Sequence, residues 1–407
     1  MDKRTLAGLM QATQLTRVGR LAEATALIQR SLAGGSTGPA PFKGTSVDSG
    51  PASEVVIEGE WSEVIAPTHS EQIERSVGPA SSVESRPGLK DAIRKWRRGQ
   101  VDDEPRTPAR ADTRQPSNWI AGIYQNAAGQ RAYKLYVPSS YTGQSLPLIV
   151  MLHGCNQTPD DFAAGTQMHA LGEEQSCFVL YPAQSNTANH SRCWNWFRRE
   201  DQARDRGEPS IIAGMTREIV NRYGIDSRKV YVAGLSAGGA MAAVMGVAYP
   251  DLYAAVGVHS GLACGSAHDL PSALAAMKGM PVSNGRPSVV AGASPSIPTI
   301  VFHGDHDKTV HPRNGAEVIS KSAHREGDHG GQVSTERGQA PDGHSYTRTV
   351  HRDAAGRVVL EHWLVHGGGH AWFGGSRAGS YSDPRGPNAA AEMLRFFRQT
   401  SGTQAGR

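Results

Sequence analysis

The segment KVYVAGLSAGGAM at 229–241 constrains the fold more than any other part of the chain. Its β-branched start predicts a strand, its Ala-rich end predicts a helix, and Ser236 lies at the sharp turn between them. The residues two before and two after such a turn must be small, and Gly234 and Gly238 meet this requirement. This G-x-S-x-G pattern between a strand and a helix predicts that Ser236 is a nucleophile held in a strained turn.

The acid and base that would activate this serine are expected downstream of it. When a nucleophilic serine lies in such a turn between a strand and a helix, the carboxylate that orients the base comes next along the chain, and the histidine base follows it. We expect Asp307 to be the acid, because it follows the predicted strand in PTIVFHGDHDKTVHPRNG, with Asp305 as the alternative in the same loop. We expect His370 to be the base, because the glycines of VVLEHWLVHGGGHAWFGGS free its loop, whereas His362 and His366 belong to the strand.

Two backbone N–H groups are candidates for stabilising the oxyanion that forms when a serine attacks a carbonyl. One belongs to Ala237, directly after the serine at the start of the predicted helix. The other belongs to Cys155, because His153 and Gly154 let the chain turn sharply after the predicted strand in LIVMLHGCNQTPDDF. This machinery uses no metal and no cofactor, and none is predicted.

After Pro116 the sequence changes to short apolar runs that alternate with helical patterns. This alternation is typical of βαβ units and predicts an α/β fold with a mostly parallel central sheet flanked by helices. The expected strands are 131–137, 146–152, 177–181, 229–233, 254–259, 299–302 and 358–365. The expected helices are 162–175, 211–223, 237–248, 312–320 and 387–398.

Three segments of different composition are predicted. Residues 1–34 carry apolar residues at helical spacing and are expected to form a short helical hairpin, which either docks on a partner or is an inert tail. Residues 35–116, rich in Ser, Gly, Pro and mixed charge, are expected to be a disordered linker. Residues 117–400 are expected to form the catalytic domain. The linker contains a basic cluster that either makes weak contact with a surface or partner or is simply solvated: Lys90, Arg94, Lys95, Trp96, Arg97 and Arg98.

Charge and cysteine content exclude several classes of function. The 42 Lys and Arg nearly balance the 38 Asp and Glu, so no strong overall field attracts nucleic acid, and none is expected as a partner. No apolar stretch reaches the roughly 18 residues of a membrane span. The four cysteines have no zinc-site spacing, and they either pair or are ordinary core residues. Cys155 and Cys193 both lie beside predicted active-site segments, but the sequence does not choose among the pairings.

Several ordered segments resemble one family of esterases. From about Trp119 to Phe397 the chain resembles the polyhydroxybutyrate depolymerase family, close to feruloyl and acetylxylan esterases. The segments that carry this resemblance are YKLYVPSSY, LHGCNQTPDDFAAGTQM, LYPAQ, CWNWF, VYVAGLSAGGAMA, HSG, VFHGDHDKTVHPRNG and GGGHAWFGG. The resemblance implies an α/β-hydrolase fold with Ser236, Asp307 and His370 as a catalytic triad. It also implies that Trp194, Trp196 and Trp372 line an ester-binding groove, although these rings fit a role as core anchors equally well.

The resemblance implies a serine esterase that forms an acyl-enzyme, acting on short-chain polyhydroxyalkanoate or hydroxybutyrate oligomers or polymer. A feruloyl or acetylxylan esterase is the first alternative. The second is a catalytically silent hydrolase domain that serves as a tethered interaction protein. Family members are commonly extracellular, so the resemblance implies an extracellular protein. The start MDKRTLAGLMQATQLTRVGR shows no secretory signal, which makes the cytoplasm the alternative. We also expect no substrate-binding domain after the catalytic one. Soluble oligomers and small esters are therefore the expected substrates, ahead of crystalline polymer.

Overall fold

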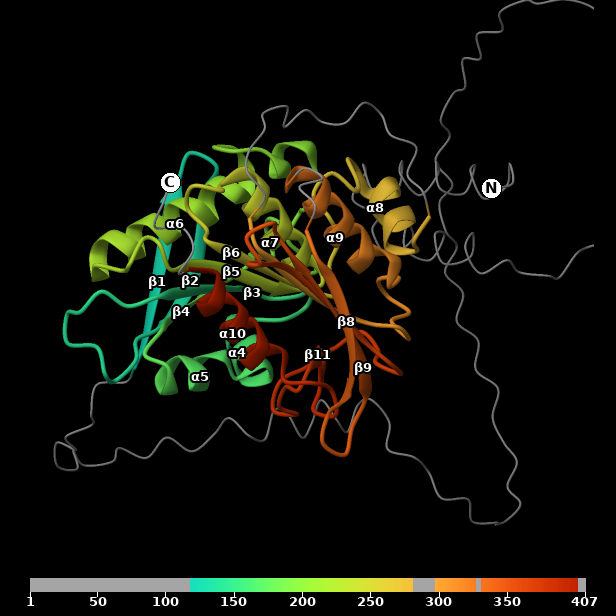
Figure 1. Cartoon of the computed structure of the whole chain (residues 1–407). Helices are drawn as coiled ribbons and strands as arrows, with labels where there is room; N and C mark the ends of the chain where they lie inside the picture. Colours follow the sequence, from blue (N-terminus) through green and yellow to red (C-terminus); the bar gives the residue numbers. More distant parts are fainter. Residues whose placement is uncertain (1–117, 281–296, 327–330, 402–407) are drawn as a thin grey trace, which may run out of the picture. The chain divides into compact units, whose positions relative to one another are not determined.

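The computed structural model describes residues 118–280, 297–326 and 331–401 of the chain. The predicted helical hairpin 1–34 and the predicted linker 35–116, with its basic cluster, lie outside the described residues. In the described part, helices pack on both faces of one large sheet (Figure 1). None of the helices in these ranges is long and apolar enough to cross a membrane.

The main sheet has ten strands, and its central strands are parallel. Antiparallel strands flank them on both sides. In spatial order the strands are β1 (Trp119–Asn126), β2 (Gly129–Tyr136), β4 (Phe178–Pro182), β3 (Leu148–Leu152), β5 (Val230–Leu235), β6 (Ala255–His259), β7 (Thr299–Gly304), β10 (Val358–Val365), β9 (Ser345–Arg352) and β8 (Val333–Gln339). A separate short sheet pairs β11 (Trp372–Phe373) with β12 (Ser382–Asp383). Because β4 to β10 run parallel, their carboxyl ends lie at one edge of the sheet, where α/β proteins bind ligands.

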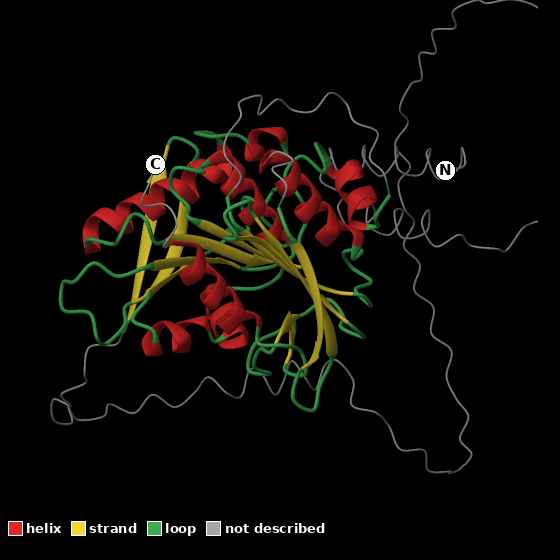
Figure 2. Ribbon diagram, viewed as in Figure 1, coloured by secondary structure: helices red, strands yellow, loops and turns green. Residues whose placement is uncertain are grey.

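Helices cover the two faces of this sheet as separate layers (Figure 2). One face carries α6 (Gly207–Tyr223), α7 (Ala237–Ala248), α8 (Leu270–Met277) and α9 (Arg313–Glu326), and the other carries α4 (Pro159–Thr166), α5 (Met168–Glu174) and α10 (Ala389–Ser401). Along β5, Val230 and Val232 pack in the first of two cores, while Tyr231 and Ala233 pack in the second. Side chains alternate between the faces of a strand, so a strand buried on both faces is apolar throughout. This explains why β5 appeared in the sequence as a continuous apolar run.

The structure adds strands that the sequence pattern does not indicate. In the main sheet these are β1 at one edge and the β8–β9 hairpin at the other, and the short strands β11 and β12 are further additions. Side chains of β8 are exposed along nearly its whole length, so this strand has no apolar signal and is held by ladder hydrogen bonds. The predicted helix 162–175 is two helices, α4 and α5, because Gln167 between them adopts a left-handed backbone with φ of 54°.

Candidate active site

Ser236 lies in a strained turn between the central strand β5 and helix α7. Its backbone has φ of 58° and ψ of −119°, which a residue with a side chain rarely adopts. The turn is tight: a Cβ added at Gly234 would lie 2.4 Å from the carbonyl of Gly238, and one added at Gly238 would lie 2.0 Å from the carbonyl oxygen of Leu152. The two glycines therefore allow the backbone to close on itself, as the sequence pattern predicted.

Asp307 follows strand β7, and both oxygens of its carboxylate accept hydrogen bonds. One oxygen accepts the backbone N–H groups of Thr309, at 2.9 Å, and Val310, at 2.8 Å. The other lies 2.7 Å from Nδ1 of His370 and 3.5 Å from Nε2 of His303. Burial by itself would raise the pKa of Asp307, but the hydrogen bonds with the two histidines and with Val310 outweigh it and hold the pKa well below its usual range.

His370 lies in the loop between β10 and β11, and its side chain is largely buried. Because Asp307 is a carboxylate that only accepts hydrogen bonds, Nδ1 of His370 carries a proton, and in the neutral ring Nε2 holds a lone pair. Within the described ranges, Nε2 of His370 has no hydrogen-bond partner. Asp305, the alternative acid, is paired instead with His366 at 2.8 Å. Each of the two candidate acids therefore binds a different histidine: Asp307 binds His370, and Asp305 binds His366.

His259, at the end of β6, connects the serine turn to the segment after His370. Its carbonyl accepts the N–H of Ser236 at 2.9 Å, and its Nε2 accepts the N–H of Phe373 at 3.0 Å. Burial, assisted by nearby His303 and His370, lowers the pKa of His259 well below its ordinary value, so its ring is neutral and Nε2 is free to accept. In the sequence His259 appears only as the first residue of the segment HSG. Its two hydrogen bonds join segments that are distant along the chain, so no local pattern indicates them.

The loop after β3 lies beside the serine turn. A Cβ added at Gly154 would lie 3.6 Å from Cβ of Ser236. Nε2 of His153 accepts the N–H of Gln184 at 3.0 Å, so Nδ1 of the neutral ring carries the proton and donates it to the carbonyl of Gly154 at 2.8 Å. Burial lowers the pKa of His153 to about 4, which keeps the ring neutral. This bond fixes the peptide plane between Gly154 and Cys155, and with it the direction of the Cys155 N–H.

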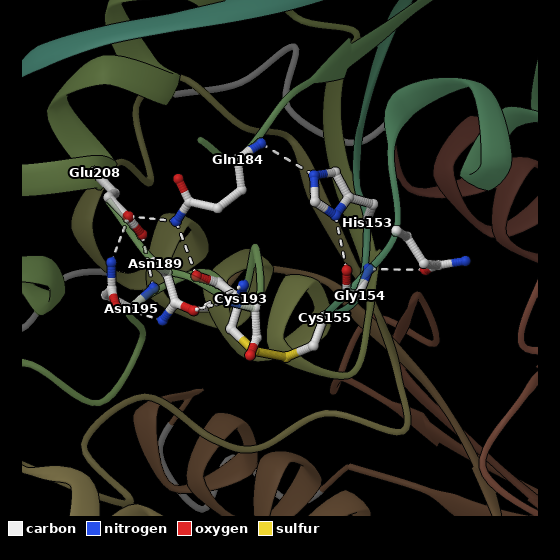
Figure 3. The surroundings of a disulfide bond; sticks show 10 residues. His153, Gly154, Cys155, Gln184, Asn189, Cys193, Asn195 and Glu208 are labelled. Atoms are coloured by element: carbon white, nitrogen blue, oxygen red, sulfur yellow. Dashed lines mark hydrogen bonds between the residues drawn. A yellow bond between two sulfur atoms is a disulfide. The ribbon is translucent and has the colours of Figure 1, made fainter. Parts of the chain in front are cut away.

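A disulfide joins Cys155 to Cys193, with their Cα atoms 4.2 Å apart, as Figure 3 shows. It is one of the pairings that the sequence left open. Gln184 holds the second half of the bridge, because its Nε2 donates to the carbonyl of Cys193 at 2.9 Å. Within the described part of the chain, the N–H groups of Cys155 and Ala237 have no hydrogen-bond acceptor. Both are therefore available to a ligand oxygen.

Buried Glu208 anchors the segment after the disulfide (Figure 3). It accepts the backbone N–H of Asn195 at 2.7 Å and the side chain of Asn195 at 2.8 Å, and it pairs with Arg131 at 3.1 Å. The sequence pattern indicates no role for Glu208. Gln184 and Asn195 are polar residues within the segments LYPAQ and CWNWF, and the pattern indicates no particular role for them either. No local signal separates these residues from ordinary surface polar residues, because their partners come from distant parts of the chain.

The three tryptophans expected in a groove are core residues in this structure. Trp194 is 0% exposed, Trp196 6% and Trp372 1%. Trp194 packs against His153, and Trp372 stacks on His259 with ring centres 4.9 Å apart. The interpretation as core anchors therefore fits the structure, because large aromatic rings gain most when they are enclosed. These contacts place Trp194 next to the loop after β3, and Trp372 next to the residue whose carbonyl binds the serine turn.

Among the described residues, no group of three or more His, Cys, Asp or Glu side chains is arranged to hold a metal ion. The chemistry available at this edge of the sheet is that of a serine hydroxyl, an Asp–His pair and backbone N–H groups. A serine in a strand-to-helix turn, on a mostly parallel sheet with helices on both faces, defines an α/β-hydrolase. The predicted fold class is confirmed by solved structures as well. The chain matches an acetyl xylan esterase from Aspergillus awamori with a TM-score of 0.53 and 22% identity, covering 66% of this chain and 94% of that one.

Residues 131–334, half of the chain, match the family described as esterase PHB depolymerase. The chain belongs to this family, as its motifs predicted. It is 33% identical over 261 residues to the poly(3-hydroxyalkanoate) depolymerase C of Paucimonas lemoignei, covering 62% of this chain and 60% of that protein's length. It is 26% identical over 284 residues to the acetylxylan esterase A of Talaromyces purpureogenus, covering 65% of this chain and 72% of that protein.

Proposed function

We propose that this protein hydrolyses carboxylic esters through an acyl-enzyme formed on Ser236. The observation that carries the proposal is the 2.7 Å hydrogen bond between Asp307 and His370, because it leaves Nε2 of the imidazole as the proton acceptor that a serine nucleophile needs. Ser236, Asp307 and His370 follow the carboxyl ends of β5, β7 and β10, which are parallel strands of one sheet. The three side chains therefore belong to the same edge.

In the proposed reaction, the hydroxyl oxygen of Ser236 attacks the ester carbonyl while Nε2 of His370 takes its proton. The carbonyl oxygen becomes an oxyanion, which the N–H groups of Cys155 and Ala237 stabilise. When the tetrahedral intermediate collapses, the bond to the alcohol breaks and His370 returns the proton to the leaving oxygen. Water then attacks the acyl-serine while Nε2 of His370 takes its proton. The bond to the Ser236 oxygen breaks, His370 returns the proton to that oxygen, and the carboxylic acid leaves. Asp307 keeps the proton on Nδ1 throughout and stabilises the imidazolium.

The proposed substrates are short-chain hydroxyalkanoate esters, as oligomers or polymer. The family match and the identity with the Paucimonas depolymerase support this class. Acetylated or feruloylated sugars are the second candidate, supported by the acetylxylan esterase A and by a feruloyl esterase B from Neurospora crassa that is 28% identical over 227 residues. Contact of the amino-terminal extension with a surface or partner stays a prediction.

The test uses the full chain and its Ser236→Ala variant. We expect the parent protein to cleave p-nitrophenyl butyrate and to be labelled at Ser236 by a fluorophosphonate probe, and the variant to do neither. Rates on hydroxybutyrate oligomers, acetylated xylan and feruloylated sugars then rank the substrate classes. A parent protein that cleaves none of these esters and leaves the probe unreacted would favour the silent interaction protein instead.

A further inference from the structure

A second chain of hydrogen bonds lies beside the Asp307–His370 pair. Asp305, after β7, binds Nδ1 of His366, after β10, at 2.8 Å. Nε2 of His366 in turn contacts the hydroxyl of Thr347, on β9, at 2.8 Å. Carboxylate, imidazole and hydroxyl thus follow one another as in a catalytic triad. The residues come from three adjacent elements at the same edge of the sheet as the candidate active site.

This series of hydrogen bonds does not have the surroundings of a second reaction centre. Thr347 lies within strand β9 rather than in a strained turn between a strand and a helix, which is where a nucleophilic serine is held in this fold. Both ring nitrogens of His366 are occupied, one by Asp305 and one by Thr347. These hydrogen bonds are therefore suited to holding structure in place.

The hydrogen bonds hold together the two loops that carry the candidate acid and base. Asp305 accepts the N–H of Gly367 at 2.7 Å and donates its own N–H to the carbonyl of Val365 at 3.0 Å. His306 donates its N–H to the carbonyl of Gly368 at 3.0 Å. The loops are also in direct contact, because a Cβ added at Gly304 would lie 2.2 Å from the carbonyl oxygen of Gly368. Asp307 and His370 extend from these two loops a few residues further on.

We propose that Asp305, His366 and Thr347 position the His370 imidazole, by clamping its loop onto the loop of Asp307. The proposal rests on the proposed esterase function, in which His370 must reach Ser236 with its ring correctly oriented. The side chains of His366 and Asp305 are 37% and 32% exposed, so the hydrogen bond between them adds little to global stability. Its effect is on geometry, and a misplacement of about 1 Å can cost about 100-fold in rate.

The hydroxyl of Thr347 makes this clamp tolerant of one particular change. A hydroxyl both donates and accepts, so it satisfies Nε2 of His366 in either neutral tautomer. In Asp305→Asn the side-chain amide donates a hydrogen bond to Nδ1 of His366, whereas the carboxylate accepts one. His366 then carries its proton on Nε2 and donates it to the hydroxyl of Thr347. The same change at Asp307 forces the proton of His370 onto Nε2, which removes the base. A positioning pair and a catalytic pair therefore respond differently to the same substitution.

The experiment measures kcat and KM on p-nitrophenyl butyrate for full-length Asp305→Ala, Asp305→Asn and His366→Phe. We expect kcat to fall about 10- to 100-fold in Asp305→Ala and His366→Phe, with KM within about threefold of the parent. We expect Asp305→Asn to stay within about threefold in both constants. The matched control is Asp353→Asn, since Asp353 also accepts backbone N–H groups and binds an arginine, but at the opposite end of β10.

Two results would overturn the proposal. One is a parent-like kcat in both Asp305→Ala and His366→Phe. The other is an Asp305→Asn variant as impaired as Asp307→Asn, which would make Asp305 the catalytic acid. If Asp305→Ala fails to fold, His366→Phe and Asp305→Asn decide between the same outcomes.

A spectroscopic measurement separates this proposal from the proposed function. In protein labelled with ¹⁵N-histidine, the Nδ1 proton of His370 is expected to give a downfield NMR signal because of its bond to Asp307. We expect this signal to shift and to exchange faster with solvent in His366→Phe, and to be unchanged in Asp353→Asn. An unchanged signal in His366→Phe contradicts the clamp even if the parent protein proves inactive on every ester, whereas activity tests of Ser236→Ala decide the proposed function alone.

Discussion

Replacing Ser236 with glycine is expected to make the protein more stable while it abolishes ester hydrolysis. The backbone of Ser236, at φ of 58° and ψ of −119°, is open to glycine but disfavoured for a residue with a Cβ. Such strain costs about 1–3 kcal/mol. Glycine also gives the unfolded chain more freedom, which costs about 0.5–1 kcal/mol in the opposite direction. The net gain is about 0–2.5 kcal/mol, which raises Tm by up to about 5 °C, because each kcal/mol shifts Tm by about 2 °C in a domain of this size.

The comparison that isolates the strain is Ser236→Gly against Ser236→Ala. Both variants lack the hydroxyl and should be inactive, but alanine keeps the Cβ and therefore the strained turn. Calorimetric melting of the two full-length proteins measures the difference, with the cleavage of p-nitrophenyl butyrate confirming the loss of activity in each. A Ser236→Gly variant that melts at or below the temperature of Ser236→Ala would show that the turn is not strained in the way its dihedral angles indicate.

Three further predictions concern the site and the packing around it. Asp307→Asn should lower kcat about 10⁴-fold on p-nitrophenyl butyrate, because an amide stabilises the wrong tautomer of the histidine base, and a loss below tenfold would contradict its assignment as the acid. Burial lowers the pKa of His153 to about 4, so the unfolded chain binds more protons than the folded one between about pH 6.5 and pH 4. Stability should therefore fall by about 3 kcal/mol from this residue as the pH drops through that window, and an NMR titration placing its pKa above 6 would refute the cause. Gly238→Ala should cost about 3 kcal/mol or prevent folding, since its Cβ would meet a carbonyl oxygen at 2.0 Å, whereas Gly369→Ala meets nothing within 4 Å and should melt like the parent.

The sequence was most informative where the structure is determined locally. The turn at Ser236 needs a strand, small residues at Gly234 and Gly238 and a helix, all within one short segment, so its pattern is visible in the letters. The central strands are buried on both faces and appear as continuous apolar runs, and β10 has the bounds that were predicted for it. Ser236, Asp307 and His370 are expected at one edge because of the parallel topology, in which each connection returns to the same edge of the sheet.

What the sequence left open depends on contacts between distant segments. Asp305 and Asp307 are nearly equivalent as letters, and only the packed loops give one to His366 and the other to His370. The pairing of Cys155 with Cys193 likewise depends on two loops that meet in the fold.

The burial of the tryptophans and the exposed edge strands were decided in the same way. A large aromatic ring is equally suited to a groove and to a core, and β8 is a strand because of its neighbour β9 rather than because of its own residues. Amino-acid sequence by itself therefore determined the type of fold and the place of the strained serine turn, since these rest on backbone strain and apolar periodicity within short segments. Tertiary structure alone decided which partner each polar side chain has, because hydrogen bonds join atoms that are near in space, whatever their separation along the chain.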